Sequence, residues 1–227
     1  VAAIDPDRVL ADAKAADRAR DRGEGGALLG LPVTIKDSLA VAGMPRRCGS
    51  YAREDDVPTE DATAVARLRR AGAIVLAKTT TPEYMWSYET ESAIHGRTVS
   101  PYDPARTPGG SSGGEAALIA AGASPVGLGT DGGGSIRVPS HYCGIVGIRP
   151  SARLVPETGC WPVTRETGMV DMSTIGPLAR SVDDVALALS LIAGEDGIDP
   201  FVGPSAVGDH RSVDMAALRV GFYQADG

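Results

Sequence analysis

Lysine is rare in this chain, and two of its lysines are candidates for chemistry. Of 22 basic residues, only Lys14, Lys36 and Lys78 are lysines. A lysine can lose its proton when burial or a nearby charge destabilises the ammonium, whereas arginine stays charged in proteins. Lys36 ends the β-branched run Leu31–Lys36, and Lys78 follows the apolar run Ala73–Ala77. This pattern leaves two interpretations open, a general base or a lysine that extends its ammonium to solvent from a strand end.

Two segments rich in glycine and serine could supply a nucleophile and an anion site. The segment Gly109–Gly114 runs into an apolar helix, and Gly132–Arg137 follows a strand and leads back into apolar sequence. Flexible linkers do not normally lie between core elements. Glycine-rich backbone can instead direct several N–H groups to one point, as in an oxyanion hole. A serine in such a segment becomes a nucleophile when a base takes its proton.

Two familiar motifs occur in these segments without the context that they need. Gly127–Gly132 reads as GxGxxG, but a dinucleotide fold requires a long helix next, and Pro139 leaves little room for one. Gly110–Gly114 reads as GxSxG, but a nucleophile elbow requires a preceding strand. The prolines of Pro101–Pro108 exclude that strand, and nothing singles out one of the three histidines as a triad partner.

The elements that must position these residues alternate between helix and strand. The pattern predicts helices over 5–20, 62–71, 115–121 and 181–193, and strands over 31–36, 73–77, 126–129 and 218–223. Such alternation favours an α/β fold. Residues 195–213 are expected to form a long surface loop. A further strand–helix unit is expected after the last strand, so we expect these residues to be part of a larger domain.

The composition of the chain limits which kinds of binding partner and which cellular compartment we expect. Hydrophobic residues make up 43% and charged residues 22% of the 227, which is typical of a packed soluble domain. A net charge of −7 argues against a nucleic-acid partner, and no apolar run reaches the ~20 residues that span a bilayer. No export signal is visible, and none of the three cysteines lies in a CxxC pair. We therefore expect a cytoplasmic protein without a structural metal.

Six segments, taken in order, resemble the amidase signature family. They are Gly30–Asp37, Ala73–Thr79, Pro108–Leu118, Gly129–Pro139, Gly144–Gly147 and Gly176–Asp184. The spacings also agree with the family pattern: 75 residues separate Lys36 from Ser111, and 24 separate Ser111 from Ser135. Asp-Gly-Gly-Gly-Ser before Ile136 is more similar to the general amidases than to transamidase subunits, which often have Asp-Thr-Gly-Gly-Ser.

The resemblance implies a role for each site residue. Ser135 would be the nucleophile, Ser111 a bridging serine that follows a cis peptide bond, and Lys36 the base. Lys78 would have no catalytic role. The other implied site residues are Gly132, Gly133 and Gly134 in the oxyanion hole, Met85 and Trp86 at the substrate pocket, and Asp131, Arg137 and Ser112 as structural support.

The resemblance also implies the fold and the reaction. Residues 1–227 would be the N-terminal and central part of an amidase signature catalytic domain, with a mixed β-sheet flanked by helices. A small-molecule amide would be hydrolysed through an acyl-enzyme on Ser135, without metal or organic cofactor, and a homodimer is the assembly to test. Two alternatives stay open at this point, the glutaminase subunit of a tRNA-dependent amidotransferase and a non-catalytic relative that keeps the fold.

Overall fold

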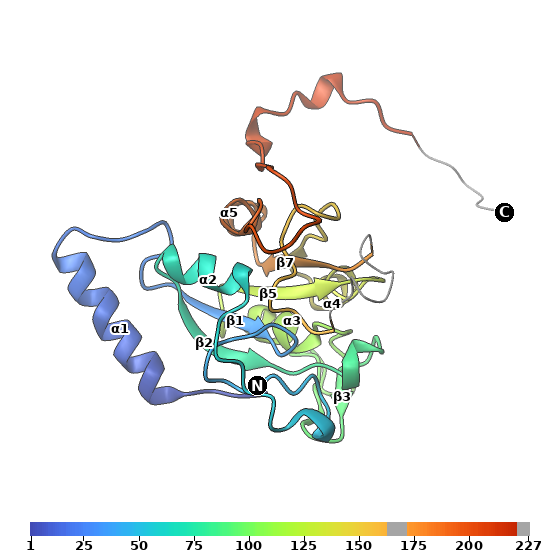
Figure 1. Cartoon of the computed structure of the whole chain (residues 1–227). Coiled ribbons are helices and arrows are strands. Elements are labelled where there is room, and N and C mark those ends of the chain that lie inside the picture. Colours follow the sequence, from blue (N-terminus) through green and yellow to red (C-terminus); the bar gives the residue numbers. More distant parts are fainter. Residues whose placement is uncertain (163–171, 222–227) are drawn as a thin grey trace.

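A mixed β-sheet of five strands forms the centre of the protein (Figure 1). The computed structural model describes residues 1–162 and 172–221. Its strands are β1 (Pro32–Lys36), β2 (Ile74–Thr79), β5 (Val126–Asp131), β6 (Val146–Gly147) and β7 (Thr174–Ala179), in the order β2-β1-β5-β7-β6. β2, β1 and β5 are parallel, whereas β7 is antiparallel to both of its neighbours. The expected mixed α/β architecture is confirmed.

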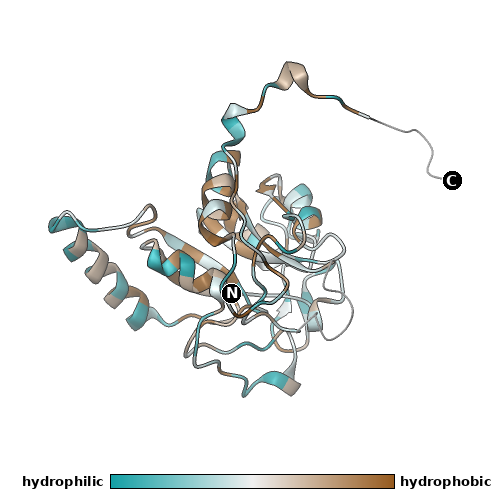
Figure 2. Ribbon diagram, turned by 45° about the horizontal axis from the view of Figure 1, so that its top comes forward, coloured by the Kyte–Doolittle hydropathy of each residue, from teal (hydrophilic) through white to brown (hydrophobic). Residues whose placement is uncertain are grey.

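Helices cover both faces of this sheet. α2 (Thr63–Arg70) and α5 (Val182–Ile192) pack together over one face, and α3 (Gly113–Ala120) and α4 (Arg137–Cys143) pack over the other. Two separate apolar clusters correspond to these faces, a large one beneath α2 and α5 and a small one beneath α3 and α4. Figure 2 shows the largely hydrophobic composition of α5. The face beneath α3 and α4 therefore has the smaller apolar cluster, and the polar residues described below lie on this face.

The alternation of β1 places its side chains on these two faces. Val33 and Ile35 belong to the large apolar cluster. Thr34 and Lys36 point the opposite way, because successive side chains of a strand face opposite sides of a sheet. Thr34 contacts Glu115 of α3, and Lys36 contacts Ser111 just before α3. One strand thus contributes both to the hydrophobic core and to the polar face.

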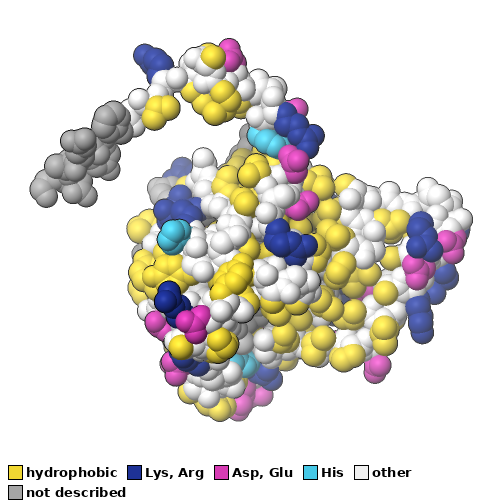
Figure 3. All heavy atoms as spheres, turned by 180° about the vertical axis from the view of Figure 1, so that it is seen from behind, with side chains coloured by type: hydrophobic (Ala, Val, Ile, Leu, Met, Phe, Trp, Pro, Cys, Tyr) yellow, Lys and Arg dark blue, Asp and Glu magenta, His cyan; other side chains and the backbone are white. Residues whose placement is uncertain are grey.

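α1 (Pro6–Asp21) projects from the body as an arm (Figure 1). Asp5 caps it, since its Oδ1 accepts a hydrogen bond from the Arg8 backbone at 3.1 Å. Leu10 on this helix is 59% exposed. Charged side chains of both signs gather along this arm when the molecule is seen from behind (Figure 3).

Two features differ from the expectation, and a third agrees with it. The helix α4 that follows Gly132 has only seven residues, so no long helix forms there, and Pro139 lies in its first turn, where an N–H has no helical partner. β7 was not expected. The strand expected at 218–223 is absent from its described part: Leu218 and Val220 are 51% and 85% exposed and lie outside any strand, while 222–227 lie outside the described residues.

Short elements complete the described chain. They are the β3 (Glu91–Ser92) and β4 (Gly96–Arg97) hairpin and the 3₁₀ turns η1 (Tyr51–Arg53), η2 (Glu83–Met85), η4 (His210–Ser212) and η5 (Met215–Ala217). In the described part of the chain, no helix has the length and apolar character to cross a bilayer. The cytoplasmic location stays a prediction.

Candidate active site

Lys36 lies buried at the end of β1, against a serine hydroxyl. Its side chain has no exposed surface, and its Nζ is 2.7 Å from Ser111 Oγ. Thr130, near the end of β5, supplies two further contacts to Nζ, from its Oγ1 at 2.8 Å and its carbonyl oxygen at 3.2 Å. Parallel pairing of β1 with β5 and the placement of the serine loop at the start of α3 bring these three residues together.

Burial changes the protonation of Lys36. Loss of hydration lowers the pKa of Lys36 to about 7, and the negative charge of Asp131 opposes this only in part. A lysine with an ordinary pKa would be an ammonium at neutral pH and could not accept a proton. Lys36 is therefore able to act as a base near pH 7, and the idea that it extends to solvent is wrong.

The two serines meet through the backbone of their loops. The Gly110–Ser111 peptide bond is cis, and Ser111 is fully buried. The Ser112 N–H donates to the Ser135 carbonyl oxygen at 3.0 Å, and Ser112 Oγ donates to the Thr130 carbonyl oxygen at 3.3 Å. For these described residues, no hydrogen bond joins the Ser111 and Ser135 hydroxyls directly. Ser112 thus links the loop of the buried serine to the loop of the half-buried one.

Asp131 holds the glycine loop that precedes Ser135. Its Oδ1 accepts from the Gly134 N–H at 2.7 Å, and its Oδ2 accepts from the Ile136 N–H at 2.9 Å. Arg137 adds two hydrogen bonds, from Nε at 3.0 Å and from Nη2 at 2.9 Å. Burial acts to raise the pKa of Asp131, but the Arg137 and backbone hydrogen bonds outweigh it and lower that pKa. The carboxylate therefore fixes the loop in one conformation.

These contacts alter the expected oxyanion hole. The Gly134 N–H, expected to face substrate, already donates to Asp131. This leaves the N–H groups of Gly132, Gly133 and Ser135 as the candidates. Tyr88, which sequence reasoning missed, fixes the loop from outside, since its hydroxyl donates to the Gly133 carbonyl oxygen at 2.7 Å.

The segment expected to line the substrate pocket lies at the surface. Trp86 is 80% exposed, and Met85 is half-buried with a φ of +62°. Nearby, the Tyr84 ring packs against Trp161 with centroids 5.1 Å apart. The described contacts connect this region to the glycine loop through Tyr88 rather than through Trp86.

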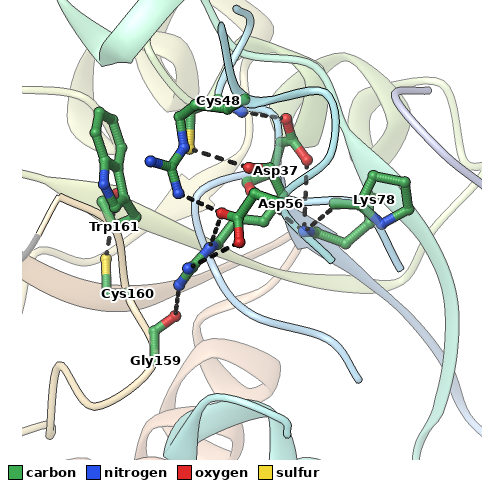
Figure 4. A network of polar contacts seen from close by, with 10 residues as sticks. Asp37, Cys48, Asp56, Lys78, Gly159, Cys160 and Trp161 are labelled. Atoms are coloured by element: carbon green, nitrogen blue, oxygen red, sulfur yellow. Dashed lines mark hydrogen bonds and ion pairs between the residues drawn. The ribbon is translucent and has the colours of Figure 1, made fainter. Parts of the chain in front are cut away.

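Lys78 is also buried but belongs to a separate network (Figure 4). Its Nζ lies 3.4 Å from Asp37 Oδ1 and donates to the backbone carbonyls of Asp37 and Pro45, each at 3.2 Å. The other oxygen of Asp37 accepts from the Cys48 N–H at 2.6 Å. Burial lowers the pKa of Lys78, and the Asp37 charge opposes this. Lys78 therefore does not extend to solvent either, and its described contacts do not include a site serine.

Glu115 is a second residue that sequence reasoning missed. It lies in the first turn of α3 with no exposed surface, and it contacts Thr34 and Thr79 hydroxyls at 2.6 Å and 2.8 Å. An acidic residue inside the apolar sequence 113–120 was the available signal. No group of three or more metal-ligating side chains occurs within the part of the chain that the structure describes.

Comparison with known proteins adds family relationships to this geometry. The family model described as Amidase matches residues 1–227. The A-type subunit of glutamyl-tRNA(Gln) amidotransferase from Roseiflexus sp. (strain RS-1) is 41% identical over 221 residues, which cover 96% of this chain and 44% of that protein. The native peptide amidase of Stenotrophomonas maltophilia is 39% identical with a TM-score of 0.82, over 88% of this chain and 41% of that one.

A further solved structure, described as a vestigial protein complex that reveals the origins of an s-triazine catabolic enzyme, is 36% identical with a TM-score of 0.85. It is matched over 91% of this chain and 44% of its own. The chain thus spans less than half the length of the relatives that it matches.

Proposed function

Because this chain belongs to the amidase signature family, we propose that its protein hydrolyses a carboxylic amide through an acyl-enzyme on Ser135. The observation that supports this most strongly is the 2.7 Å contact between the buried Lys36 Nζ and Ser111 Oγ. A buried lysine with a pKa near 7 is a base, and a buried hydroxyl beside it is a proton relay.

In the first half-reaction, uncharged Lys36 accepts the Ser111 proton while Ser111 takes the proton of Ser135. The Ser135 oxygen attacks the amide carbon, and the carbonyl oxygen becomes an oxyanion that N–H groups of Gly132 and Gly133 stabilise. The tetrahedral intermediate collapses when Ser111 returns a proton to the leaving nitrogen and regains one from Lys36. Ammonia or an amine leaves, and the acyl group stays on Ser135.

In the second half-reaction, water replaces the amine. Lys36, through Ser111, takes a proton from the water as its oxygen attacks the acyl carbon. Collapse of the second intermediate returns the proton to Ser135 Oγ and releases the acid. Asp131, Arg137 and Ser112 support the site by holding the two loops in register.

A second candidate is the glutaminase role in a tRNA-dependent amidotransferase. It is favoured by relatives named as the A-type subunit of glutamyl-tRNA(Gln) amidotransferase, at 40–41% identity over nearly the whole chain. Such a protein would release ammonia from glutamine for use by its partner subunits. The glycine sequence before Ser135 favours the general amidase, and homodimer formation stays a prediction.

The deciding experiment measures ammonia release by the purified protein. One arm supplies aliphatic, aryl and peptide amides, and the other supplies glutamine with and without charged tRNA. Turnover of a simple amide that disappears in a Ser135→Ala variant supports the first proposal. Turnover of glutamine but of no simple amide, with a rate that charged tRNA increases, supports the second proposal. A folded wild-type protein with neither activity would contradict both and favour a non-catalytic relative.

A further inference from the structure

Glu115 is a fully buried carboxyl that the proposed mechanism does not use. It lies against the sheet so closely that a Cβ at Gly127 of β5 would overlap its Oε2. Among the residues that the structure describes, Glu115 takes part in no ion pair, and its side-chain contacts are with threonine hydroxyls. Lys36 lies on the same face of β1, two residues after Thr34. Because no cation pairs with this buried carboxyl, its protonation state has to be determined from its hydrogen bonds.

The hydrogen atoms around Glu115 can be counted. Three contacts form a chain: Glu115 Oε2 to Thr34 Oγ1 at 2.6 Å, Thr34 Oγ1 to Ser124 Oγ at 3.0 Å, and Ser124 Oγ to the Val126 carbonyl oxygen at 2.9 Å. A carbonyl oxygen only accepts, so Ser124 uses its one hydroxyl hydrogen there. Thr34 then donates its one hydrogen to Ser124. The contact between Glu115 and Thr34 has no hydrogen left unless the carboxyl carries it.

We propose that Glu115 is a neutral carboxylic acid whose Oε2 donates to Thr34. Its Oε1 is then the carbonyl oxygen, and it accepts from Thr79 Oγ1 at 2.8 Å. With this one proton, every hydroxyl and every contact of the cluster is satisfied, as buried polar groups require. Burial is the largest influence on the carboxyl and raises the pKa of Glu115 to about 7, which is consistent with a proton at neutral pH.

The neutral acid has a consequence for the base, and this step rests on the proposed function. An ionised Glu115 would stabilise the ammonium form of Lys36, which has no lone pair for the Ser111 proton. A neutral Glu115 leaves the sheet face beneath Lys36 without that charge. Glu115 is therefore a positioning residue that keeps Lys36 uncharged while its hydroxyl contacts tie α3 to β1 and β2.

Infrared difference spectroscopy tests the proton directly, without any activity. Spectra of the wild type and of Glu115→Gln are compared at mildly acid pH, above the usual pKa range of exposed carboxyls. The difference is expected to contain the carbonyl stretch of a protonated acid. Glu60→Gln, at an exposed position, is the control and should remove only carboxylate bands. Carboxylate bands alone in the Glu115 difference would overturn the proposal.

Thr79→Val gives a second readout if the glutamine variant does not fold. Removing the Thr79 hydroxyl should move the acid carbonyl band to higher frequency, because Oε1 loses its donor. A spectrum without that band in either Thr79→Val or the wild type would equally overturn the proposal.

The pH dependence of hydrolysis tests the link to Lys36. Glu115→Gln should keep the rising limb of the wild-type profile within about half a unit, because one neutral group replaces another. If Glu115 were an ionised counterion, the limb would move to lower pH by about 1–3 units. An acid band in a wild type that hydrolyses no amide would defeat the proposed function and leave the neutral acid intact. Amide hydrolysis by a wild type that lacks the acid band would overturn the neutral acid and leave the proposed function intact.

Discussion

Replacing Lys36 with methionine should abolish hydrolysis and make the protein more stable. The pKa of Lys36 falls from 10.5 to about 7 on folding because burial removes the hydration of its ammonium. Each pKa unit corresponds to about 1.4 kcal/mol, so the buried lysine costs roughly 5 kcal/mol at pH 7. Methionine has similar length and no charge. It forfeits three contacts with Ser111 and Thr130, worth roughly 3 kcal/mol together. We expect a net gain of about 2 kcal/mol.

The sign of the pH dependence follows from the same pKa. Between about pH 7 and 10.5, the unfolded chain holds a proton on Lys36 that the folded chain does not. Stability due to this residue therefore rises with pH across that window, by up to about 1.4 kcal/mol per unit, and is constant above and below it. Lys36→Met should lose this contribution. Urea denaturation of wild type and variant at several pH values measures both the offset and the slope.

Lys78→Met is the matched control, since it makes the same substitution at the other fully buried lysine. Lys78 is paired with Asp37, so its removal leaves a buried carboxylate without its cation. Breaking a buried pair in this way destabilises by about 3–5 kcal/mol. The two variants should therefore move stability in opposite directions. A Lys36→Met protein that is destabilised as much as Lys78→Met, or that keeps the wild-type pH slope, would refute the reasoning.

Three further outcomes are expected. Ser135→Ala should keep the fold and lose essentially all hydrolysis, because no oxygen remains to carry the acyl group; residual turnover in ammonia release would exclude covalent catalysis at this residue. Hydrolysis should rise with pH through about 7 and then level off as Lys36 becomes neutral, and a profile that falls over this range would contradict the base assignment. Asp131→Asn should lower kcat by about 10²-fold, because it weakens the hydrogen bonds that Gly134, Ile136 and Arg137 donate to this carboxylate and so misaligns the N–H donors of the loop. An unchanged kcat would show that the loop keeps its conformation without the Asp131 carboxylate.

The sequence pattern predicted the sheet where strands are apolar and missed it where they are not. Leu31–Lys36 and Ala73–Ala77 are continuous β-branched or apolar runs, and both fall on strands of the structure. β7 contains Gly176 and Pro177, which argue against a central strand. It forms because β5 and β6 pair with it on both sides, and Pro177 lies opposite Leu128. Tertiary pairing of this kind leaves no local signal.

The partner of each lysine was likewise invisible in the local sequence. Asp37 follows Lys36 directly, yet it pairs with Lys78, while Lys36 contacts Ser111. Adjacent residues of an extended chain point to opposite sides, so neighbours in sequence join different networks. The contact with Ser111 was expected from the family resemblance across 75 residues. The ion pair with Asp37 was not expected, because only the packing of β2 against the loop after β1 creates it.

The position of Lys36 explains why the polar face of the sheet contains so many hydroxyls. A buried amine can serve as a base only where no permanent negative charge faces it, yet the surrounding backbone and side chains still need hydrogen-bond partners. Thr34, Thr79 and Thr130 meet both requirements, because a hydroxyl both donates and accepts without carrying charge. The carboxylate of Asp131 is compatible with this arrangement because Arg137 and three backbone N–H groups occupy its oxygens. Valine at position 130 would remove one of the acceptors of Lys36, and valine at position 34 or 79 would remove a hydroxyl partner of Glu115, so threonine rather than valine suits these positions.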